Sequence, residues 1–196
     1  MSKGRLEAFS DGVVAILITI MVLELRAPAE PTLAALRPLL PTFLAYLLSF
    51  VFLGIYWNNH HHLLHAVRHV DGRVLWANLH LLFWLSLLPF VTHWTGETRF
   101  AEVPVAAYGG VLLLAGTAYW LLVHALIARE GRDSLLASAI GSDLKGNISI
   151  VAYLAAIPLA FVYPPVANAF YVAVAILWLV PDRRIENVLL QKEARS

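Results

Sequence analysis

Long apolar runs restrict this sequence to a small set of folds. Six stretches are predominantly apolar, over 6–25, 39–58, 74–94, 103–128, 147–162 and 166–180, and only the first contains Asp, Glu, Lys or Arg. The hydrocarbon core of a bilayer is about 30 Å thick, which roughly 20 helical residues cross. The runs are continuous rather than alternating, so they do not match the strands of a membrane barrel. The sequence therefore predicts an all-α, polytopic membrane protein with six transmembrane helices in one domain over residues 1–196.

Composition excludes several classes of function. Sixty per cent of the 196 residues are hydrophobic and 14% are charged, against about 25% charged residues in a soluble domain. The mean hydropathy is +0.71. A formal net charge of +1 offers no electrostatic attraction for nucleic acid, and the absence of cysteine excludes disulfides and thiolate metal sites. These values exclude a disordered chain, a nucleic-acid-binding protein and a cytosolic enzyme.

Basic residues predict the topology of the helices. With the N-terminus inside, the inner segments hold Lys3, Arg5, Arg68, Arg73, Arg129, Arg132, Lys145, Arg183, Arg184, Lys192 and Arg195. The outer loops hold only Arg26, Arg37 and Arg99. Because basic residues accumulate on the cytoplasmic side, an even number of spans with both termini in the cytoplasm is expected. The last two spans meet at Pro164-Pro165, which predicts a helical hairpin, and the tail after Pro181 is expected to begin as a helix.

A secretory signal peptide is the competing interpretation of the N-terminus. Two basic residues precede the apolar run 12–23, and the tripeptide 27–29 resembles a cleavage site. However, Asp11 and Glu24 bracket the run directly, and Pro28 suits cleavage poorly. Removal of this segment would also leave five spans and spoil the charge distribution. A first transmembrane helix is therefore favoured.

The first span has two distinct faces. At about 100° per residue, Phe9, Ile16 and Leu23 fall on one line, with Thr19 and Ile20 beside it. A second group, Arg5, Ser10 and Asp11, projects elsewhere. Charged groups at a membrane edge normally face protein or water rather than lipid. This helix is therefore expected to contact protein, or a central feature, on both faces.

The string Arg5-x-x-x-Phe9-Ser10-Asp11 resembles the signature of the transmembrane protein 175 family. Members of this family are endosomal and lysosomal potassium channels of animals and their bacterial relatives. Animal members carry two six-helix repeats, whereas this chain has one, like the bacterial members. The resemblance implies a homotetramer in the inner (plasma) membrane, with no cofactor and with potassium and other monovalent cations as its permeant partners.

The resemblance also implies where ions pass. In the family the first helices of the subunits line a central pore without a carbonyl filter. Carried onto this sequence, the narrowest ring is Ile16, with further rings at Ile20 and Leu23 and a hydroxyl from Thr19 near the pathway. Apolar rings can gate by dewetting, and weak selectivity for potassium over sodium is expected without a ring of carbonyl dipoles.

Each of these residues also has a simpler interpretation. An apolar stripe on a membrane helix usually packs against another helix or lipid. Arg5 and Asp11 could act as a topology signal and as a charge that suits the helix dipole. We prefer a polar network, within or between subunits, that holds Arg5, Phe9, Ser10 and Asp11 near the inner mouth of the pore.

Histidines cluster after the second span, where five of the eight lie between His60 and His69. His61, His65 and His69 are spaced as one helical face that could bind a metal. Dinuclear membrane enzymes need several such boxes, and only one is present. We expect no metal here: the imidazoles bond to backbone, water or the polar cluster of the first span. Which histidine contacts Ser10 or Asp11 is left open.

Two other classes of function compete with a channel. A secondary transporter is expected to show broken helices or charges at mid-membrane, and the candidates for breaks are Pro89 and Pro158. A histidine-dependent membrane metalloenzyme needs a second constellation of ligands, and no catalytic residues stand out. A channel needs only a lined pathway, so the lack of reactive groups favours a channel and not an enzyme.

Overall fold

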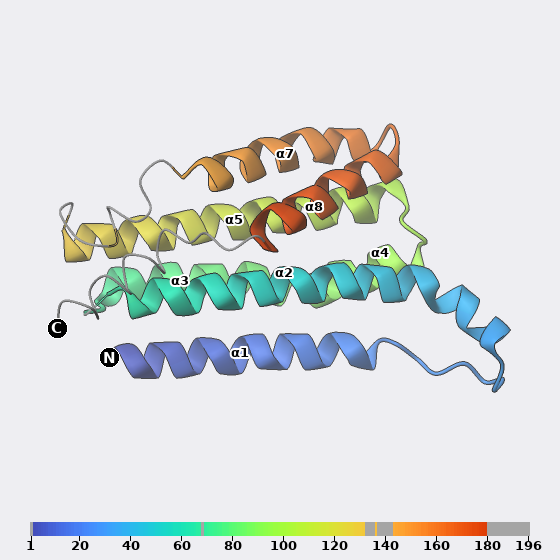
Figure 1. Cartoon of the computed structure of the whole chain (residues 1–196), viewed down its shortest axis with the longest axis horizontal. Helices are drawn as coiled ribbons and strands as arrows, with labels where there is room; N and C mark the ends of the chain where they lie inside the picture. Colours follow the sequence, from blue (N-terminus) through green and yellow to red (C-terminus); the bar gives the residue numbers. More distant parts are fainter. Residues whose placement is uncertain (1, 68, 132–135, 137–142, 180–196) are drawn as a thin grey trace.

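The apolar runs fold as long helices that lie side by side (Figure 1). The computed structural model describes residues 2–67, 69–131, 136 and 143–179. Its elements are α1 (Lys3–Leu23), the 3₁₀ helix η1 (Leu33–Leu39), α2 (Leu40–His65), α3 (Gly72–Ser86), α4 (Leu88–Glu97), α5 (Glu102–Glu130), α7 (Leu144–Ala160) and α8 (Pro164–Leu179). The predicted all-α fold is confirmed. The helix expected after Pro181 lies outside the described residues.

Four helical stretches are long and apolar enough to cross a membrane. They are Lys3–Leu23, Leu33–His65, Gly72–Glu97 and Glu102–Glu130. The 21 residues of α1 extend about 31 Å at 1.5 Å per residue, close to the thickness of a bilayer core. Helices α7 and α8 are apolar but shorter, with 17 and 16 residues. The chain is a multi-pass membrane protein, and the crossing of all six spans stays a prediction.

A proline and a cap explain where α3 begins and where it gives way to α4. The predicted range 74–94 is divided at Leu87, since Pro89 has no N–H to donate to the carbonyl of Leu85. At the other end of α3, the Asp71 carboxylate accepts from two backbone N–H groups of the first turn, each at 3.0 Å. The cap fixes the start of α3, a short connection after the histidine-rich end of α2.

The arrangement of the helices leaves α1 at one edge. Figure 1 shows α1 beside α2, with α7 and α8 at the opposite edge. Helix α5 lies between them and packs against α3 and α4 as well as against α7 and α8. Helix α1 packs against α2, α3 and α4. One side of α1 is therefore covered by other helices of the same chain, and no helix of the described part of the chain covers its other side.

Close contacts between helices hold the centre together. Ser49 of α2 bonds to Thr92 of α4 at 2.6 Å and to Tyr108 of α5 at 2.8 Å, and all three side chains are buried. The Tyr171 hydroxyl of α8 donates to the Val105 carbonyl at 3.1 Å. The polar groups of these four side chains are thus paired, as an apolar interior requires.

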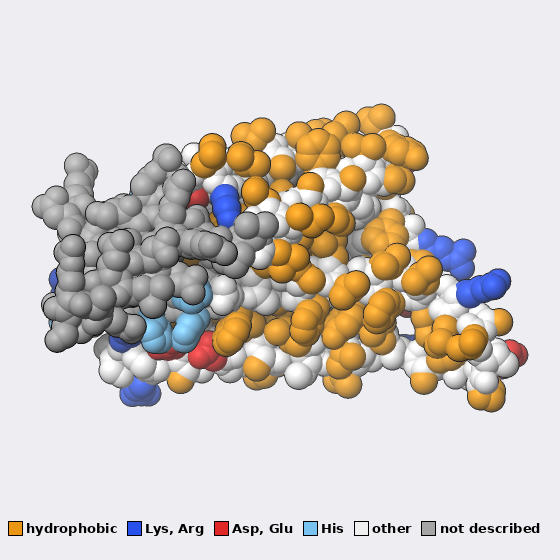
Figure 2. Space-filling model, in the orientation of Figure 1, with side chains coloured by type: hydrophobic (Ala, Val, Ile, Leu, Met, Phe, Trp, Pro, Cys, Tyr) orange, Lys and Arg blue, Asp and Glu red, His pale blue; other side chains and the backbone are white. Residues whose placement is uncertain are grey.

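The outer surface has the distribution expected of a protein in a membrane. On the face shown in Figure 2, hydrophobic side chains cover the middle, most charged side chains lie toward the two ends, and the histidines lie toward one end. Large exposed hydrophobic side chains include Phe90 on α4, Val151 on α7 and Ile176 on α8. An exposed apolar band of this kind is typical of membrane-spanning helices.

Candidate functional site

Helix α1 has two different faces in the structure, one buried and one exposed. One face is buried against the neighbouring helices and consists of Leu6, Ser10, Val14, Leu17 and Met21. The other is exposed and holds the predicted stripe: Phe9 is 51% exposed, Ile16 57%, Ile20 42% and Leu23 77%, and Thr19 is exposed too. The structure therefore gathers the stripe on the side of α1 that its own chain leaves uncovered.

The Thr19 hydroxyl makes its contacts within α1. It donates to the carbonyls of Ile16, at 2.9 Å, and Ala15, at 3.1 Å. Hydroxyls bonded in this way to the preceding turn keep their oxygen lone pairs available. Thr19 can therefore offer an acceptor at the exposed face without losing its own donor.

Ser10 belongs to a buried chain of hydrogen bonds across three helices. The Ser10 hydroxyl donates to the Leu6 carbonyl at 2.9 Å and accepts from the Asn78 side-chain amide of α3 at 2.9 Å. The Asn78 Oδ1 in turn bonds to His60 Nε2 of α2 at 2.7 Å, and because Oδ1 only accepts, His60 donates. Ser10, Asn78 and His60 are all at most 5% exposed. These hydrogen bonds hold α1 against α2 and α3.

Asp11 has a separate partner. The Trp57 indole N–H of α2 donates to Asp11 Oδ1 at 3.0 Å. Arg5 and Phe9 of the same motif are exposed and lie away from this contact. The structure thus brings Ser10 and Asp11 to α2 and α3, but it does not bring Arg5 to them within one chain.

The sequence does not say which histidine contacts the polar cluster of the first span. In the structure, His60 is joined to Ser10 through Asn78. Sequence reasoning missed Asn78 and Trp57. An isolated amide within the apolar run of α3 was the available signal for Asn78, since a buried amide needs partners. Nothing in the sequence singles out Trp57 from the other tryptophans.

The predicted face of three histidines does not form. Helix α2 extends beyond residue 58, where the second span was expected to end, and includes His61 and His65. It ends at His65, so His69 lies outside it, and the His69 backbone N–H donates to Glu130 at 3.0 Å. The rings of His61 and His65 lie with centroids 4.4 Å apart, and both approach Glu7 of α1.

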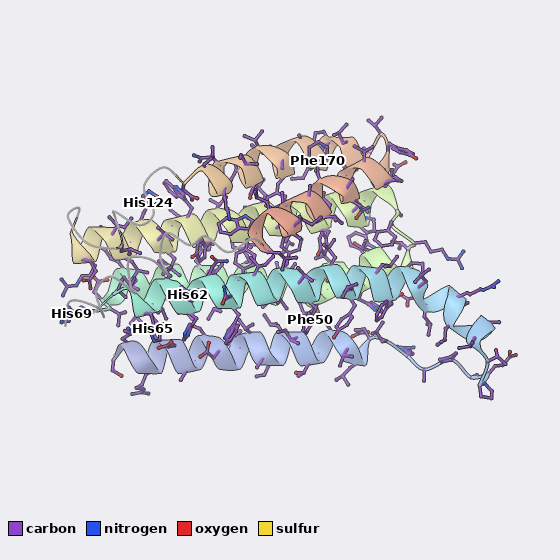
Figure 3. The ribbon with its side chains drawn as sticks, in the orientation of Figure 1. Phe50, His62, His65, His69, His124 and Phe170 are labelled. Carbon is purple, nitrogen blue, oxygen red and sulfur yellow. The ribbon has the colours of Figure 1, made fainter. Side chains whose placement is uncertain are left out.

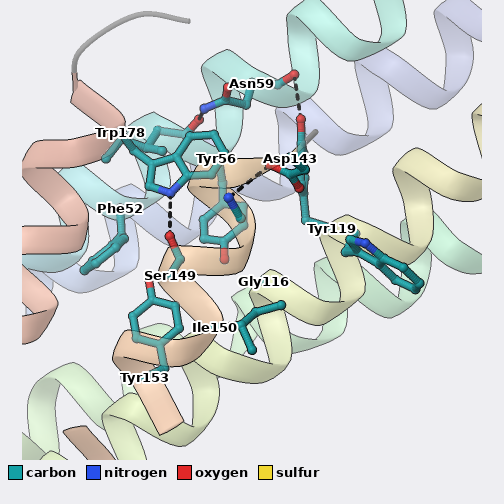
Figure 4. Close-up of a pocket in the computed structure, with 13 residues that line it drawn as sticks. Phe52, Tyr56, Asn59, Gly116, Tyr119, Asp143, Ser149, Ile150, Tyr153 and Trp178 are labelled. Carbon is teal, nitrogen blue, oxygen red and sulfur yellow. Dashed lines mark hydrogen bonds between the residues drawn. The ribbon is translucent and has the colours of Figure 1, made fainter. Parts of the chain in front are cut away.

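A pocket lies on the other side of α2, away from α1. It is lined by residues of α2, α5, α7 and α8, including Tyr56, Tyr119, Tyr153 and Trp178 (Figure 4). Two of its polar groups are bonded within it: the Trp178 indole donates to Ser149 at 2.9 Å, and the Tyr119 hydroxyl donates to the Asn59 carbonyl at 3.3 Å. The pocket brings no group to the exposed face of α1.

Known proteins resemble this chain over most of its length. The family model described as endosomal/lysosomal potassium channel TMEM175 matches residues 5–89, which include the motif, His60 and Asn78. A potassium channel of Chryseobacterium sp. (strain P1-3) is 56% identical over 189 residues, covering 96% of this chain and 98% of that protein. The chain belongs to the TMEM175 family. Its similarity to the transmembrane protein 175 family, seen first in the motif, is thereby confirmed.

Two further relatives show how far the TMEM175 likeness extends. The crystal structure of a lysosomal potassium-selective channel TMEM175 homolog from Chamaesiphon minutus matches with a TM-score of 0.77 and 29% identity, covering 92% of this chain and 97% of that one. The endosomal/lysosomal proton channel TMEM175 of Mus musculus is 34% identical over 116 residues, which is 53% of this chain but 23% of the mouse protein. Fold and relatives are those of an ion-channel family, not of an enzyme.

Proposed function

We propose that this TMEM175-family chain forms a potassium-permeable channel, in which four copies place α1 around a central pathway. The observation that carries the proposal is the row of large apolar side chains on the uncovered side of α1. One helix cannot enclose a pathway, but four can, with neighbouring axes about 8–10 Å apart. The potassium channels among the relatives support the choice of ion.

The exposed stripe supplies the constriction of the proposed pore. Ile16 forms the narrowest ring, Ile20 and Leu23 form rings further along α1, and Thr19 adds a polar atom near the pathway. An apolar neck of this kind resists wetting, so an ion crosses it only with part of its hydration shell. Potassium keeps its hydration shell less tightly than sodium, and weak selectivity for potassium follows.

The polar contacts of α1 have a different role in this proposal. The Ser10–Asn78–His60 chain and the Asp11–Trp57 bond set the rotation of α1, and thereby aim Ile16 inward. Arg5 and Phe9 are exposed in one chain, which leaves them available for contacts between subunits near the inner mouth.

The orientation in the membrane completes the proposal. The chain crosses the inner (plasma) membrane with both termini in the cytoplasm, and lipid covers the apolar surface of α7 and α8. The first turn of α1 and the histidine-rich end of α2 then lie at the cytoplasmic side.

Ion flux into liposomes that hold the purified protein tests the proposal. Flux is measured under a potassium gradient and under a sodium gradient, for the wild type and for Ile16→Ala. Truncation widens the narrowest ring in four subunits at once, so flux rises and the preference for potassium falls. Val22→Ala is the matched control, because Val22 is also exposed (44%) but lies about 120° away around α1.

Three results would contradict the proposal. One is an Ile16→Ala protein whose flux and ion preference equal those of the wild type. Another is undiminished flux from a protein that is monomeric by light scattering in detergent. The third is saturable flux coupled stoichiometrically to a counter-ion, which would identify a secondary transporter instead.

A further inference from the structure

Three side chains that bind metals meet where α1 begins and α2 ends. Glu7 Oε1 of α1 lies 3.2 Å from His61 Nδ1 and 3.6 Å from His65 Nδ1, both of α2. One ligand atom from each of the three residues lies within 4.8 Å of the others. Figure 3 shows His65 between the ribbons of α1 and α2, and Figure 2 shows histidine and acidic side chains adjoining at this end.

We infer that Glu7, His61 and His65 form a binding site for a divalent transition-metal cation such as Zn²⁺, which bridges α1 and α2. Zinc bonds to imidazole nitrogen at about 2.0–2.1 Å and to carboxylate oxygen at about 2.0–2.2 Å. Two ligands of a tetrahedral zinc ion are therefore about 3.3–3.5 Å apart. The two separations from Glu7 fall close to this spacing, so small side-chain rotations complete the site.

The ligand types select the class of metal. Two imidazoles and one carboxylate are a common three-ligand set for zinc, whereas Ca²⁺ and Mg²⁺ take oxygen ligands. Copper(II) and nickel(II) fit the same donors, and geometry and availability decide between them. The His65 side chain is 54% exposed and that of His61 39%, so a cation reaches the site from solvent and a water can take the fourth position.

The site is built on ordered elements. His61 and His65 are one turn apart on α2, which places their rings on one face of the helix. The Trp57 ring stacks on His61 with a centroid separation of 6.1 Å, and Trp57 is itself held by Asp11. Outer contacts of this kind orient metal ligands. Lys3 Nζ also donates to the Val67 carbonyl at 3.2 Å, which ties the start of α1 to the chain beyond α2.

This site differs from the one weighed in the sequence. There the candidate was a face of His61, His65 and His69, and no metal was expected. In the structure His69 lies outside α2, and a carboxylate from another helix replaces it.

Calorimetric titration of ZnCl₂ into the full chain, purified in detergent with any affinity tag removed, tests the inference. We expect one zinc ion per chain in the wild type. Loss of an outer-shell partner already costs about 10–100-fold in metal affinity, so His61→Ala, His65→Ala and Glu7→Gln should each weaken binding by at least about tenfold. His69→Ala is the matched control and should bind like the wild type.

Thermal unfolding gives a second readout. A cation that binds only the folded chain raises the unfolding temperature. At the same zinc concentration, the wild type and His69→Ala should therefore be stabilised more than the three ligand variants. If Glu7→Gln does not fold, the two histidine variants decide the matter.

Absence of saturable zinc binding by the wild type would overturn the inference. Equal affinities of the wild type and His61→Ala would do the same. Neither readout uses ion flux, so a failure of the proposed channel function leaves the outcome of this test unchanged, and the reverse also holds.

Discussion

Replacing Asn78 with leucine should lower the free energy of unfolding more than replacing an exposed asparagine with leucine. Asn78 is fully buried and joins two partners, through the 2.9 Å bond to Ser10 and the 2.7 Å bond with His60. Leucine has the same branched shape and the same number of side-chain heavy atoms, although its methyl groups are bulkier, and it has neither a donor nor an acceptor. The substitution therefore leaves the His60 N–H and one lone pair of Ser10 buried without partners.

The magnitude follows from these two groups. A buried polar group left unsatisfied, here the His60 N–H, costs about 1–3 kcal/mol, and Ser10 adds less because its hydroxyl keeps its bond to the Leu6 carbonyl. Membrane proteins tend to the lower end, since measured interhelical hydrogen bonds average about 0.6 kcal/mol. At about 2 kcal/mol, the unfolding temperature of a chain of this size falls by about 4–8 °C.

The assay is thermal unfolding of detergent-purified protein followed by tryptophan fluorescence. A triple variant provides the decisive comparison. It combines Ser10→Ala, His60→Leu and Asn78→Leu, and so removes all three hydrogen-bonded side chains. Replacing all partners by apolar groups can be nearly neutral, so the triple variant should be more stable than Asn78→Leu alone. Additive losses in the triple variant would refute the argument that unsatisfied groups, rather than lost packing, cause the effect.

Two further predictions concern packing and topology. Gly109→Ala should lower the unfolding temperature, because a Cβ there would overlap the buried Tyr171 hydroxyl. Gly110→Ala is the matched control, since a Cβ at Gly110 would have nothing within 4 Å. Equal unfolding temperatures of the two variants would contradict the close packing of α5 against α8. The chain has no cysteine, so single cysteines report topology: Arg99→Cys should react with a membrane-impermeant maleimide in intact cells and Arg73→Cys should not, and the reverse pattern would invert the proposed orientation.

The helices could be predicted from the sequence because continuous apolar runs leave the backbone no other way to satisfy its hydrogen bonds in lipid. Their bounds were less predictable. The second span was expected to end at residue 58, because Asn59 and the histidines are polar. In the structure α2 runs on to His65, since a helix need not stop where the apolar surface ends.

The candidate site also has a part that could be predicted from the sequence and a part that could not. Helical periodicity placed Ile16, Ile20 and Leu23 together, because these positions are related within one helix. Asn78 and Ser10 are 68 positions apart, and their contact depends on how α1 and α3 pack. Glu7 and His61 meet for the same reason. Contacts between helices depend on packing that a single sequence does not encode as a local pattern.

The direction of the hydrogen bonds around Ser10 has a consequence for proton movement. His60 donates to Asn78, Asn78 donates to Ser10, and Ser10 donates to the Leu6 carbonyl. A Grotthuss relay needs every member to accept a proton on one side and release one on the other. The side-chain amide of Asn78 does not exchange its protons in this way, and a helix carbonyl has none to pass on. The Ser10–Asn78–His60 group therefore does not relay protons, and any proton current through this protein must follow another route.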